Sequence, residues 1–217
     1  MRIEYSNTDS GIEGCAQATA LTLPVKYLTY RRIAEVALIM LLLPALLLIM
    51  LFISVPVFLC FKGKVIFRQQ RVGTNGKIFT IYKFRTIDDN NGYDNCGNPL
   101  SKENVCMIGR FFRRHRFDEL PQLLNVIKGD MSLIGPRPEI VRQFDFYAAT
   151  IPNYSFRKSI PQGITGWSQV NYPHSDTVEG NYIKLKYDIE YINNIGFKLD
   201  MRIILSTIIL ILKGRLN

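Results

Sequence analysis

The feature that most constrains this chain is an uncharged run of residues from Val36 to Phe61. In helical form such a run is roughly 39 Å long, which exceeds the ~30 Å hydrocarbon core of a bilayer. A cleaved signal peptide fits poorly, because the run starts late, is too long and lacks a small-residue cleavage site. The sequence therefore predicts a membrane-embedded helical segment.

Two observations argue against a simple membrane span. Pro44 lies inside the run, where a proline removes a backbone donor and bends or breaks a helix. Basic residues also flank both ends of the run: Arg31 and Arg32 before it, and Lys62, Lys64, Arg68 and Arg71 after it. A spanning helix usually has this excess on one side only. We therefore predict a re-entrant helix–break–helix hairpin over residues 31–61, broken at Pro44. A Pro-kinked single span remains the alternative.

A second informative stretch runs from residue 109 to residue 129. Leu120, Leu123, Leu124 and Ile127 recur at helical spacing, and Gly129 is a plausible stop. This places Asp118 and Glu119 at the start of a short helix. Four arginines lie just upstream, namely Arg110, Arg113, Arg114 and Arg116. We expect these cations to keep both carboxylates ionised. Taken alone, however, an Asp-Glu pair in a first helical turn is explained by the helix dipole.

The composition indicates what the chain binds. Its net charge of +9 favours anionic partners, which include phospholipid headgroups, nucleic acid and phosphorylated substrates. The four cysteines show no paired spacing and there are only two histidines, so a structural zinc site or a disulfide framework is not expected. A metal ion would more naturally be a hard cation held by carboxylates and phosphate.

The expected fold class is α/β in the α+β sense, mostly helical with a short β-hairpin. Residues 65–67 and 78–82 have strand character, and the Asn-Gly of the intervening residues 73–76 suits a hairpin turn. Residues 182–192 and 203–212 are predicted to be helical. We expect an N-terminal extension at residues 1–30, the membrane hairpin at residues 31–61 and a cytosolic-face catalytic domain at residues 62–217.

Two further patterns suggest anion-binding groups. Lys83 and Arg85 would share one face of a strand, although a solvated edge strand explains them equally well. Arg137 lies between two prolines, which fix the neighbouring φ angles and hold it extended. Such an arginine is preorganised for a phosphate contact, and an exposed arginine in a proline turn is the alternative.

Together these residues resemble the bacterial sugar transferase family, the monotopic phosphoglycosyl transferases that act on polyprenyl phosphate. The resemblance extends from about Arg31 to about Leu212, in a chain the size of a minimal member. It rests on five motifs in order behind the interrupted apolar segment, at residues 67–73, 83–86, 118–126, 129–138 and 161–167.

The resemblance implies a two-step reaction that transfers a sugar-1-phosphate from a UDP-sugar to polyprenyl (undecaprenyl) phosphate. Asp118 would be the nucleophile that carries the sugar-phosphate after UMP leaves, and Glu119 its partner in a carboxylate dyad. Mg²⁺, held by Asp118 and the diphosphate, would be the cofactor. The product would enter the first membrane step of glycoconjugate assembly, for a capsule, O-antigen, exopolysaccharide or glycoprotein glycan.

Other residues acquire roles by the same resemblance. Arg113 and Arg137 would contact substrate phosphate or nucleotide, with Lys83 and Arg85 as further contributors. Two acidic residues, Asp188 and Asp200, match positions of the family pattern without an assigned role, and Pro44 matches the residue that breaks the family's membrane helix. The chain departs from the family where Glu35 replaces a frequent aspartate and where Arg116 replaces a small hydroxyl residue.

The resemblance also implies a location and partners. The enzyme would be monotopic in the lipids of the bacterial inner (cytoplasmic) membrane, with its active site on the cytoplasmic face. A homodimer is an assembly consistent with the family, and no nucleic acid is expected as a partner. The competing hypothesis is a catalytically inactive, membrane-anchored basic module that acts as a binding protein or scaffold.

Overall fold

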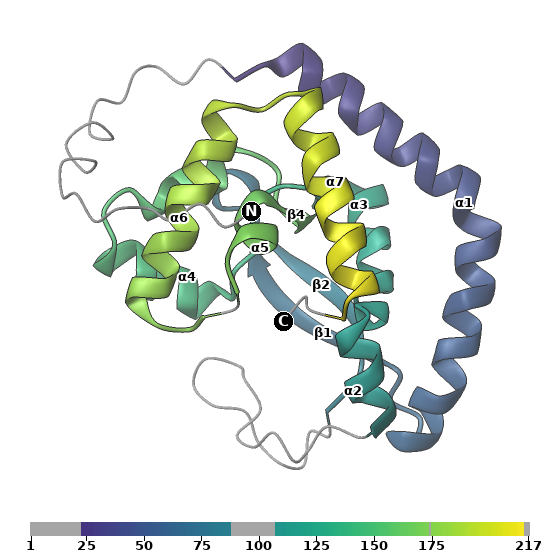
Figure 1. Cartoon of the computed structure of the whole chain (residues 1–217). Helices are drawn as coiled ribbons and strands as arrows, with labels where there is room; N and C mark the ends of the chain where they lie inside the picture. Colours follow the sequence, from purple (N-terminus) through teal and green to yellow (C-terminus); the bar gives the residue numbers. More distant parts are fainter. Residues whose placement is uncertain (1–22, 88–106, 174, 215–217) are drawn as a thin grey trace.

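The computed structural model of the protein describes residues 23–87, 107–173 and 175–214. These residues form mostly helices, with two small two-stranded sheets (Figure 1). The predicted fold class, mostly helical with a short hairpin, is confirmed. Most of the predicted N-terminal extension, residues 1–22, lies outside the described residues.

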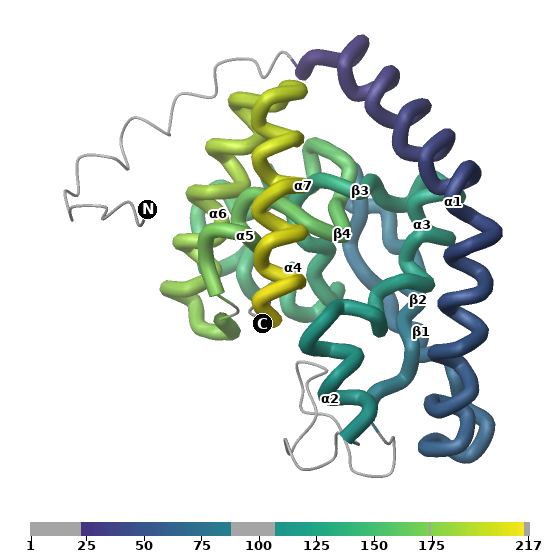
Figure 2. The backbone as a smooth tube through the Cα atoms, turned by 45° about the vertical axis from the view of Figure 1, so that its right-hand side comes forward, coloured from purple at the N-terminus to yellow at the C-terminus, as the bar shows by residue number. Residues whose placement is uncertain are grey.

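The longest element is helix α1 (Val25–Cys60), which arches along one side of the molecule (Figures 1 and 2). It begins six residues before the predicted hairpin and continues through Pro44, so the predicted break at Pro44 is not present. A proline removes only one helical hydrogen bond, and the leucines on both sides favour helix, so α1 bends instead of ending. The helix ends at a turn in which Lys62 and Gly63 have positive φ angles.

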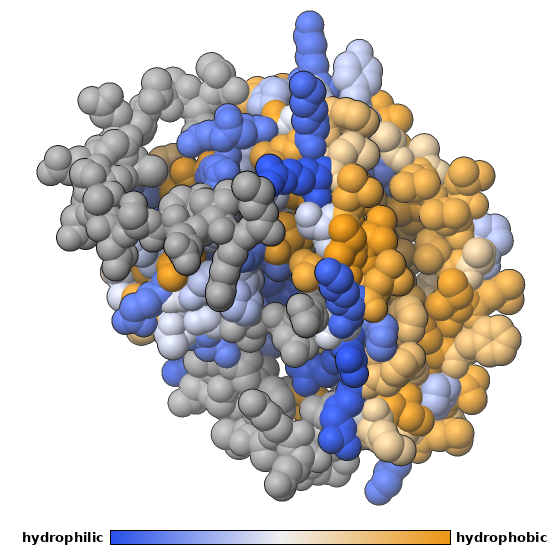
Figure 3. Space-filling model, in the orientation of Figure 1, coloured by the Kyte–Doolittle hydropathy of each residue, from blue (hydrophilic) through white to orange (hydrophobic). Residues whose placement is uncertain are grey.

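Helix α1 is long and apolar enough to cross a membrane. Most of its large apolar side chains are exposed, whereas a core helix of this composition would bury them. Figure 3 shows the resulting hydrophobic surface over the side of the molecule that α1 occupies. A long apolar helix with an exposed apolar surface indicates membrane association.

The predicted hairpin is confirmed. Strands β1 (Ile66–Val72) and β2 (Ile78–Phe84) pair antiparallel, with Ile66 opposite Phe84 and Val72 opposite Ile78. The short 3₁₀ turn η3 (Thr74–Gly76) joins them, and Asn75 and Gly76 both have positive φ angles. An Asn-Gly pair tolerates this conformation well, which explains why the local sequence specifies the turn.

The middle of the chain packs on this hairpin. Helix α2 (Met107–Arg114) leads into the 3₁₀ helix η6 (Phe117–Gln122) and then helix α3 (Leu123–Lys128). Strand β3 (Ser132–Ile134) follows and pairs in parallel with β4 (Gly163–Thr165), a pairing that the sequence did not predict. As predicted, Gly129 ends the α3 helix, in the left-handed conformation that glycine adopts without strain.

The remaining elements form the other half of the molecule (Figure 2). In chain order they are α4 (Val141–Thr150), η7 (Tyr154–Ser159), α5 (Trp167–Asn171), α6 (Val178–Asn193) and α7 (Phe197–Leu212). The two predicted C-terminal helices are confirmed, and α7 starts earlier than the sequence indicated. Apolar clusters join α4 to η7 and α6, and β3 to α5, α6 and α7. Two further clusters pack α1 against β2, α3 and α2.

Candidate active site

The two adjacent carboxylates of η6 lie against strand β2. Both Asp118 and Glu119 are buried, and the residue at the start of η6, Arg116, has a left-handed φ of 58°. Lys83 contacts Glu119 from the end of strand β2, and Arg137 contacts it from the proline-rich segment after β3. Residues more than 50 positions apart in the sequence thus meet at one point.

One oxygen atom of Glu119 receives three cations. Its Oε1 accepts hydrogen bonds from Nζ of Lys83 at 2.9 Å, Nη1 of Arg116 at 3.0 Å and Nη2 of Arg137 at 3.1 Å. Burial alone raises the pKa of the Glu119 carboxyl, but these three cations outweigh it and hold that pKa well below its usual value. Glu119 is therefore an anchored anion that fixes the positions of the three cations.

Asp118 has the opposite character. Burial, and then repulsion from Glu119, raises its pKa to about 6, although Lys83, Arg116 and Arg113 oppose the shift. Its Oδ1 is buried and has no hydrogen-bond partner among the described residues. The arginines were expected to keep both carboxylates ionised; they hold Glu119 well below its usual pKa, whereas the pKa of Asp118 rises because the nearest cations bind Glu119 instead. A more basic carboxylate with an unoccupied oxygen is the better nucleophile.

The dyad lines a cavity of about 970 Å³. All six residues predicted to form the site line it: Lys83, Arg85, Arg113, Asp118, Glu119 and Arg137. The Lys83 side chain is largely buried, and this burial lowers its pKa to about 8 although Glu119 opposes the shift. Most charged groups around the cavity are cationic, as binding of a diphosphate requires.

Another part of the wall of the same cavity is polar and, apart from Asp176 and Lys184, uncharged. It is formed by side chains from α4, α5 and α6 that include Gln143, Ser168, Gln169, Tyr172 and Asn181. Amides and hydroxyls of this kind both donate and accept hydrogen bonds, as recognition of sugar hydroxyls or of a base requires. The sequence did not identify this wall, because its residues carry no local pattern.

The other two predicted acidic residues do not line the cavity. Asp188 accepts a hydrogen bond from Nε of Arg157 at 2.7 Å, and both side chains are buried. Asp200 accepts hydrogen bonds from Tyr27 at 2.6 Å and from Tyr191 at 2.8 Å, and pairs with Arg31 at 3.1 Å. Asp200 therefore joins the start of α7 to the start of α1.

Three site residues were missed as contributors. Arg116 was identified only as one of the cations upstream of the dyad and as a departure from the family, whereas it binds Glu119 directly. Arg157 pairs with Glu139 at 2.9 Å and donates to the carbonyl oxygen of Arg137 at 3.3 Å, so it supports the segment that carries Arg137. Glu139 directly follows the Gly-Pro-Arg-Pro motif, which is the one local signal for it. Arg157 has no such signal.

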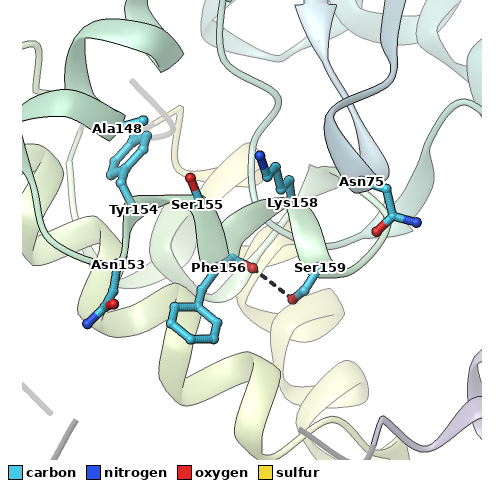
Figure 4. A pocket seen from close by; sticks show the side chains of 8 residues that line it. All are labelled: Asn75, Ala148, Asn153, Tyr154, Ser155, Phe156, Lys158 and Ser159. Atoms are coloured by element: carbon cyan, nitrogen blue, oxygen red, sulfur yellow. Dashed lines mark hydrogen bonds between the residues drawn. The ribbon is translucent and has the colours of Figure 1, made fainter. Parts of the chain in front are cut away.

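A second hollow, of about 600 Å³, lies at the tip of the hairpin against η7 (Figure 4). Its lining has one cation and no carboxylate: Asn75, Ala148, Asn153, Tyr154, Ser155, Phe156, Lys158 and Ser159. The hydroxyl of Ser159 donates to the Phe156 carbonyl oxygen at 2.7 Å within η7. This hollow has no carboxylate and only one cation, so the candidate active site is the cavity at Asp118.

Comparison with known proteins gives consistent matches. The model of the bacterial sugar transferase family matches residues 26–214. A UDP-N-acetylgalactosamine-undecaprenyl-phosphate N-acetylgalactosaminephosphotransferase of Aeromonas hydrophila is 41% identical over 155 residues, covering 70% of this chain and 36% of that one. A UDP-glucose:undecaprenyl-phosphate glucose-1-phosphate transferase of Xanthomonas campestris pv. campestris is 38% identical, covering 76% of this chain and 35% of that one. The matched part is thus only about a third of the length of each of these two relatives.

A relative closer in length is the uncharacterized sugar transferase EpsL of Bacillus subtilis (strain 168). It is 40% identical over 161 residues, covering 74% of this chain and 76% of its own.

Proposed function

Given that the chain belongs to the bacterial sugar transferase family, we propose that it transfers a sugar-1-phosphate from a UDP-sugar to undecaprenyl phosphate or a similar polyprenyl phosphate. The names of two longer relatives, in which the acceptor is undecaprenyl phosphate, support this donor and acceptor. The observation that carries the proposal is Asp118 itself, a buried carboxylate of raised pKa whose Oδ1 lacks a partner among the described residues.

In the proposed first step, an oxygen of the Asp118 carboxylate attacks the phosphorus that carries the sugar. A bond forms between Asp118 and that phosphorus, the bond from the phosphorus to the bridging diphosphate oxygen breaks, and UMP leaves with the electron pair. Lys83, Arg116 and Arg137 surround this position and can stabilise charge on the phosphoryl oxygens.

In the second step, an oxygen of the lipid phosphate attacks the same phosphorus, and the Asp118 carboxylate leaves. The products are a polyprenyl-diphosphate-sugar and free enzyme. Covalent catalysis divides one transfer between two bulky substrates into two simpler displacements, so nucleotide and lipid need not occupy the cavity together.

Mg²⁺ is the proposed cofactor. The described residues contain no cluster of three or more acidic, histidine or cysteine side chains. The donor diphosphate would therefore supply part of the coordination of the ion. Asp118 fits as the protein ligand, because its Oδ1 has no protein hydrogen-bond partner in the described part of the chain. When bound, Mg²⁺ supplies positive charge that neutralises the diphosphate during transfer.

We place the enzyme in the bacterial inner membrane as a monotopic protein with its cavity on the cytoplasmic face. The basic residues at both ends of α1, Arg31 and Arg32 before the apolar run and Lys62 and Lys64 after it, favour a helix that enters and leaves one leaflet. The curvature of α1 supports this re-entrant arrangement (Figure 1). The lipid-linked product would begin the membrane stage of glycoconjugate assembly.

The test is intact-protein mass spectrometry after the full chain is incubated in detergent with Mg²⁺ and a panel of UDP-sugars, without acceptor lipid. We expect an added sugar-phosphate mass that maps to Asp118 and is absent from Asp118→Asn. Lack of both the adduct and UMP release, with polyprenyl phosphate added in a second arm, would favour the scaffold hypothesis. Full turnover by Asp118→Asn would exclude the assigned nucleophile.

A further inference from the structure

Helix α2 lies between the apolar helix α1 and the reaction cavity, and its faces differ. Phe112 is buried among Ile53, Val57 and Phe61 of the segment that ends α1. The side chains of Met107 and Phe111, four residues apart on one face, are 78% and 53% exposed. Unlike Phe112, these two side chains are exposed apolar groups on a helix that packs against the end of α1.

The other exposed face of α2 carries three arginines. Arg113 and Arg114 follow Arg110 by three and four residues, and all three line the cavity that contains Asp118. None of the three forms an ion pair with a residue that the structure describes. Arg113 is near enough to lower the pKa of Asp118. The arginines thus lead from the apolar edge of the molecule toward the dyad.

The apolar edge continues beyond α2. The C-terminal half of α7 exposes Leu205, Ile208, Ile209 and Leu212, and Gly214 at its end lies directly against Arg114. In Figure 3, hydrophilic side chains border the hydrophobic surface in the region where α7 and α2 lie. The arginine face of α2 is therefore positioned where a membrane surface would meet the mouth of the cavity.

Building on the proposed function, we propose that α2 is the entry site for the acceptor lipid. Arg110 and Arg114 bind the phosphate monoester of a polyprenyl phosphate while Met107 and Phe111 contact the first isoprene units. Arg113 then receives the phosphate on the Asp118 side. The structure favours the lipid over the nucleotide at this place, because a nucleotide-sugar has no apolar chain to contact the exposed face of α2.

The charge of the ligand supports the same assignment. A phosphate monoester carries up to two negative charges near neutral pH, whereas the headgroup phosphate of an ordinary phospholipid is a diester with one. Three neighbouring arginines that form no ion pair with a described residue attract the monoester more strongly. Because guanidinium groups bind phosphate oxygens in pairs, they also position it.

The experiment measures binding of a fluorescent polyprenyl phosphate, and of the matching polyprenol, to the full chain in detergent micelles. We expect the wild type to prefer the phosphate, and Arg110→Gln/Arg114→Gln to weaken phosphate binding by about tenfold while polyprenol binding is unchanged. Arg110→Lys/Arg114→Lys should recover part of the loss, because it restores the charge but not the paired contacts. The matched control is Arg68→Gln, which removes an exposed arginine of β1 that does not line the cavity.

Phosphate binding by the double glutamine variant at wild-type strength would overturn the proposal. So would an equal loss in Arg68→Gln, which would indicate general attraction of anionic lipid. Competition by excess phosphatidylglycerol distinguishes a site for the phosphate monoester from general attraction of anionic phospholipid. Binding of the polyprenyl phosphate to a monoester site should be little affected by this competitor. UMP release without acceptor is measured in parallel: its absence in the wild type, with lipid binding intact, would count against the proposed function and leave the entry site standing.

Discussion

The Nζ atom of Lys83 lies 2.9 Å from Oε1 of Glu119, and both side chains are largely buried. This one contact opposes burial at both ends, since it lowers the pKa of Glu119 and raises that of Lys83. Glu119 has two further cations and stays ionised, whereas burial dominates at Lys83, whose pKa falls to about 8. The site therefore holds a lysine and an aspartate that both titrate within about one pH unit of neutrality.

We predict a bell-shaped pH dependence for the first half-reaction. Asp118 must be ionised to attack, so the rate should fall as pH decreases through about 6, and Lys83 must be protonated, so it should fall again as pH rises through about 8. The measurement is the single-turnover rate constant of UMP release without acceptor lipid, which keeps the acceptor's own ionisation out of the profile. A rate that stays constant from about pH 5 to about pH 9 would contradict this assignment.

Replacing Glu119 by Gln should move both limbs of that profile toward lower pH. The Glu119 charge raises the pKa of Asp118 and also raises that of Lys83, so its removal lowers both values. The rate at the optimum should fall by about 100-fold, because three cations lose the oxygen that positions them. An acidic limb that stays in place or moves upward would show that Glu119 does not tune Asp118.

Loss of Arg157 should destabilise the fold. In Arg157→Ala, the carboxylates of Asp188 and Glu139 lose a buried partner, which typically costs about 3–5 kcal/mol. For a chain of this size we expect a fall in Tm of roughly 10 °C. Thermal unfolding is compared with the exposed-site control Arg68→Ala, which should stay close to wild type. Similar Tm values for both variants would mean that the buried pairs contribute nothing.

Local signals predicted the hairpin, the end of α3 at Gly129 and the two C-terminal helices, because Asn-Gly turns, glycine stops and helical spacing act over a few residues. The proposed break at Pro44 failed because one missing donor does not outweigh the helix preference of its leucine-rich neighbours. The six residues predicted for the site do converge on one cavity. The opposite pKa shifts of Asp118 and Glu119 were not predictable, because they depend on which carboxylate oxygen faces the cations.

The same limit applies to Arg157 and Asp188. They are 31 positions apart, and nothing in the local sequence pairs them. Asp200, likewise, is joined to Arg31 across 169 positions. Pairings of this kind follow from tertiary packing, which a single sequence does not reveal, and they explain why acidic residues of the family pattern lie outside the cavity.

Gly135 should be intolerant of a side chain, because β3 and β4 approach each other too closely there. A Cβ atom on Gly135 would lie 2.2 Å from the carbonyl oxygen of Pro161 and 3.0 Å from the amide nitrogen of Gly163, and neither backbone atom can move independently. Gly135→Ala must therefore separate the two strands or displace the segment that carries Arg137. We expect a destabilisation of about 1–3 kcal/mol or more and a loss of activity larger than the fall in Tm explains, because Arg137 leaves Glu119.

The matched control is Gly196→Ala at the start of α7. Gly196 has an extended φ of 179°, and a Cβ atom there would meet only the carbonyl oxygen of Asn194 at 3.9 Å. Wild-type stability and activity are expected for this variant. Thermal unfolding and UMP release are measured on both proteins, and a well-folded Gly135→Ala enzyme with full activity would mean that the strands can separate without moving Arg137.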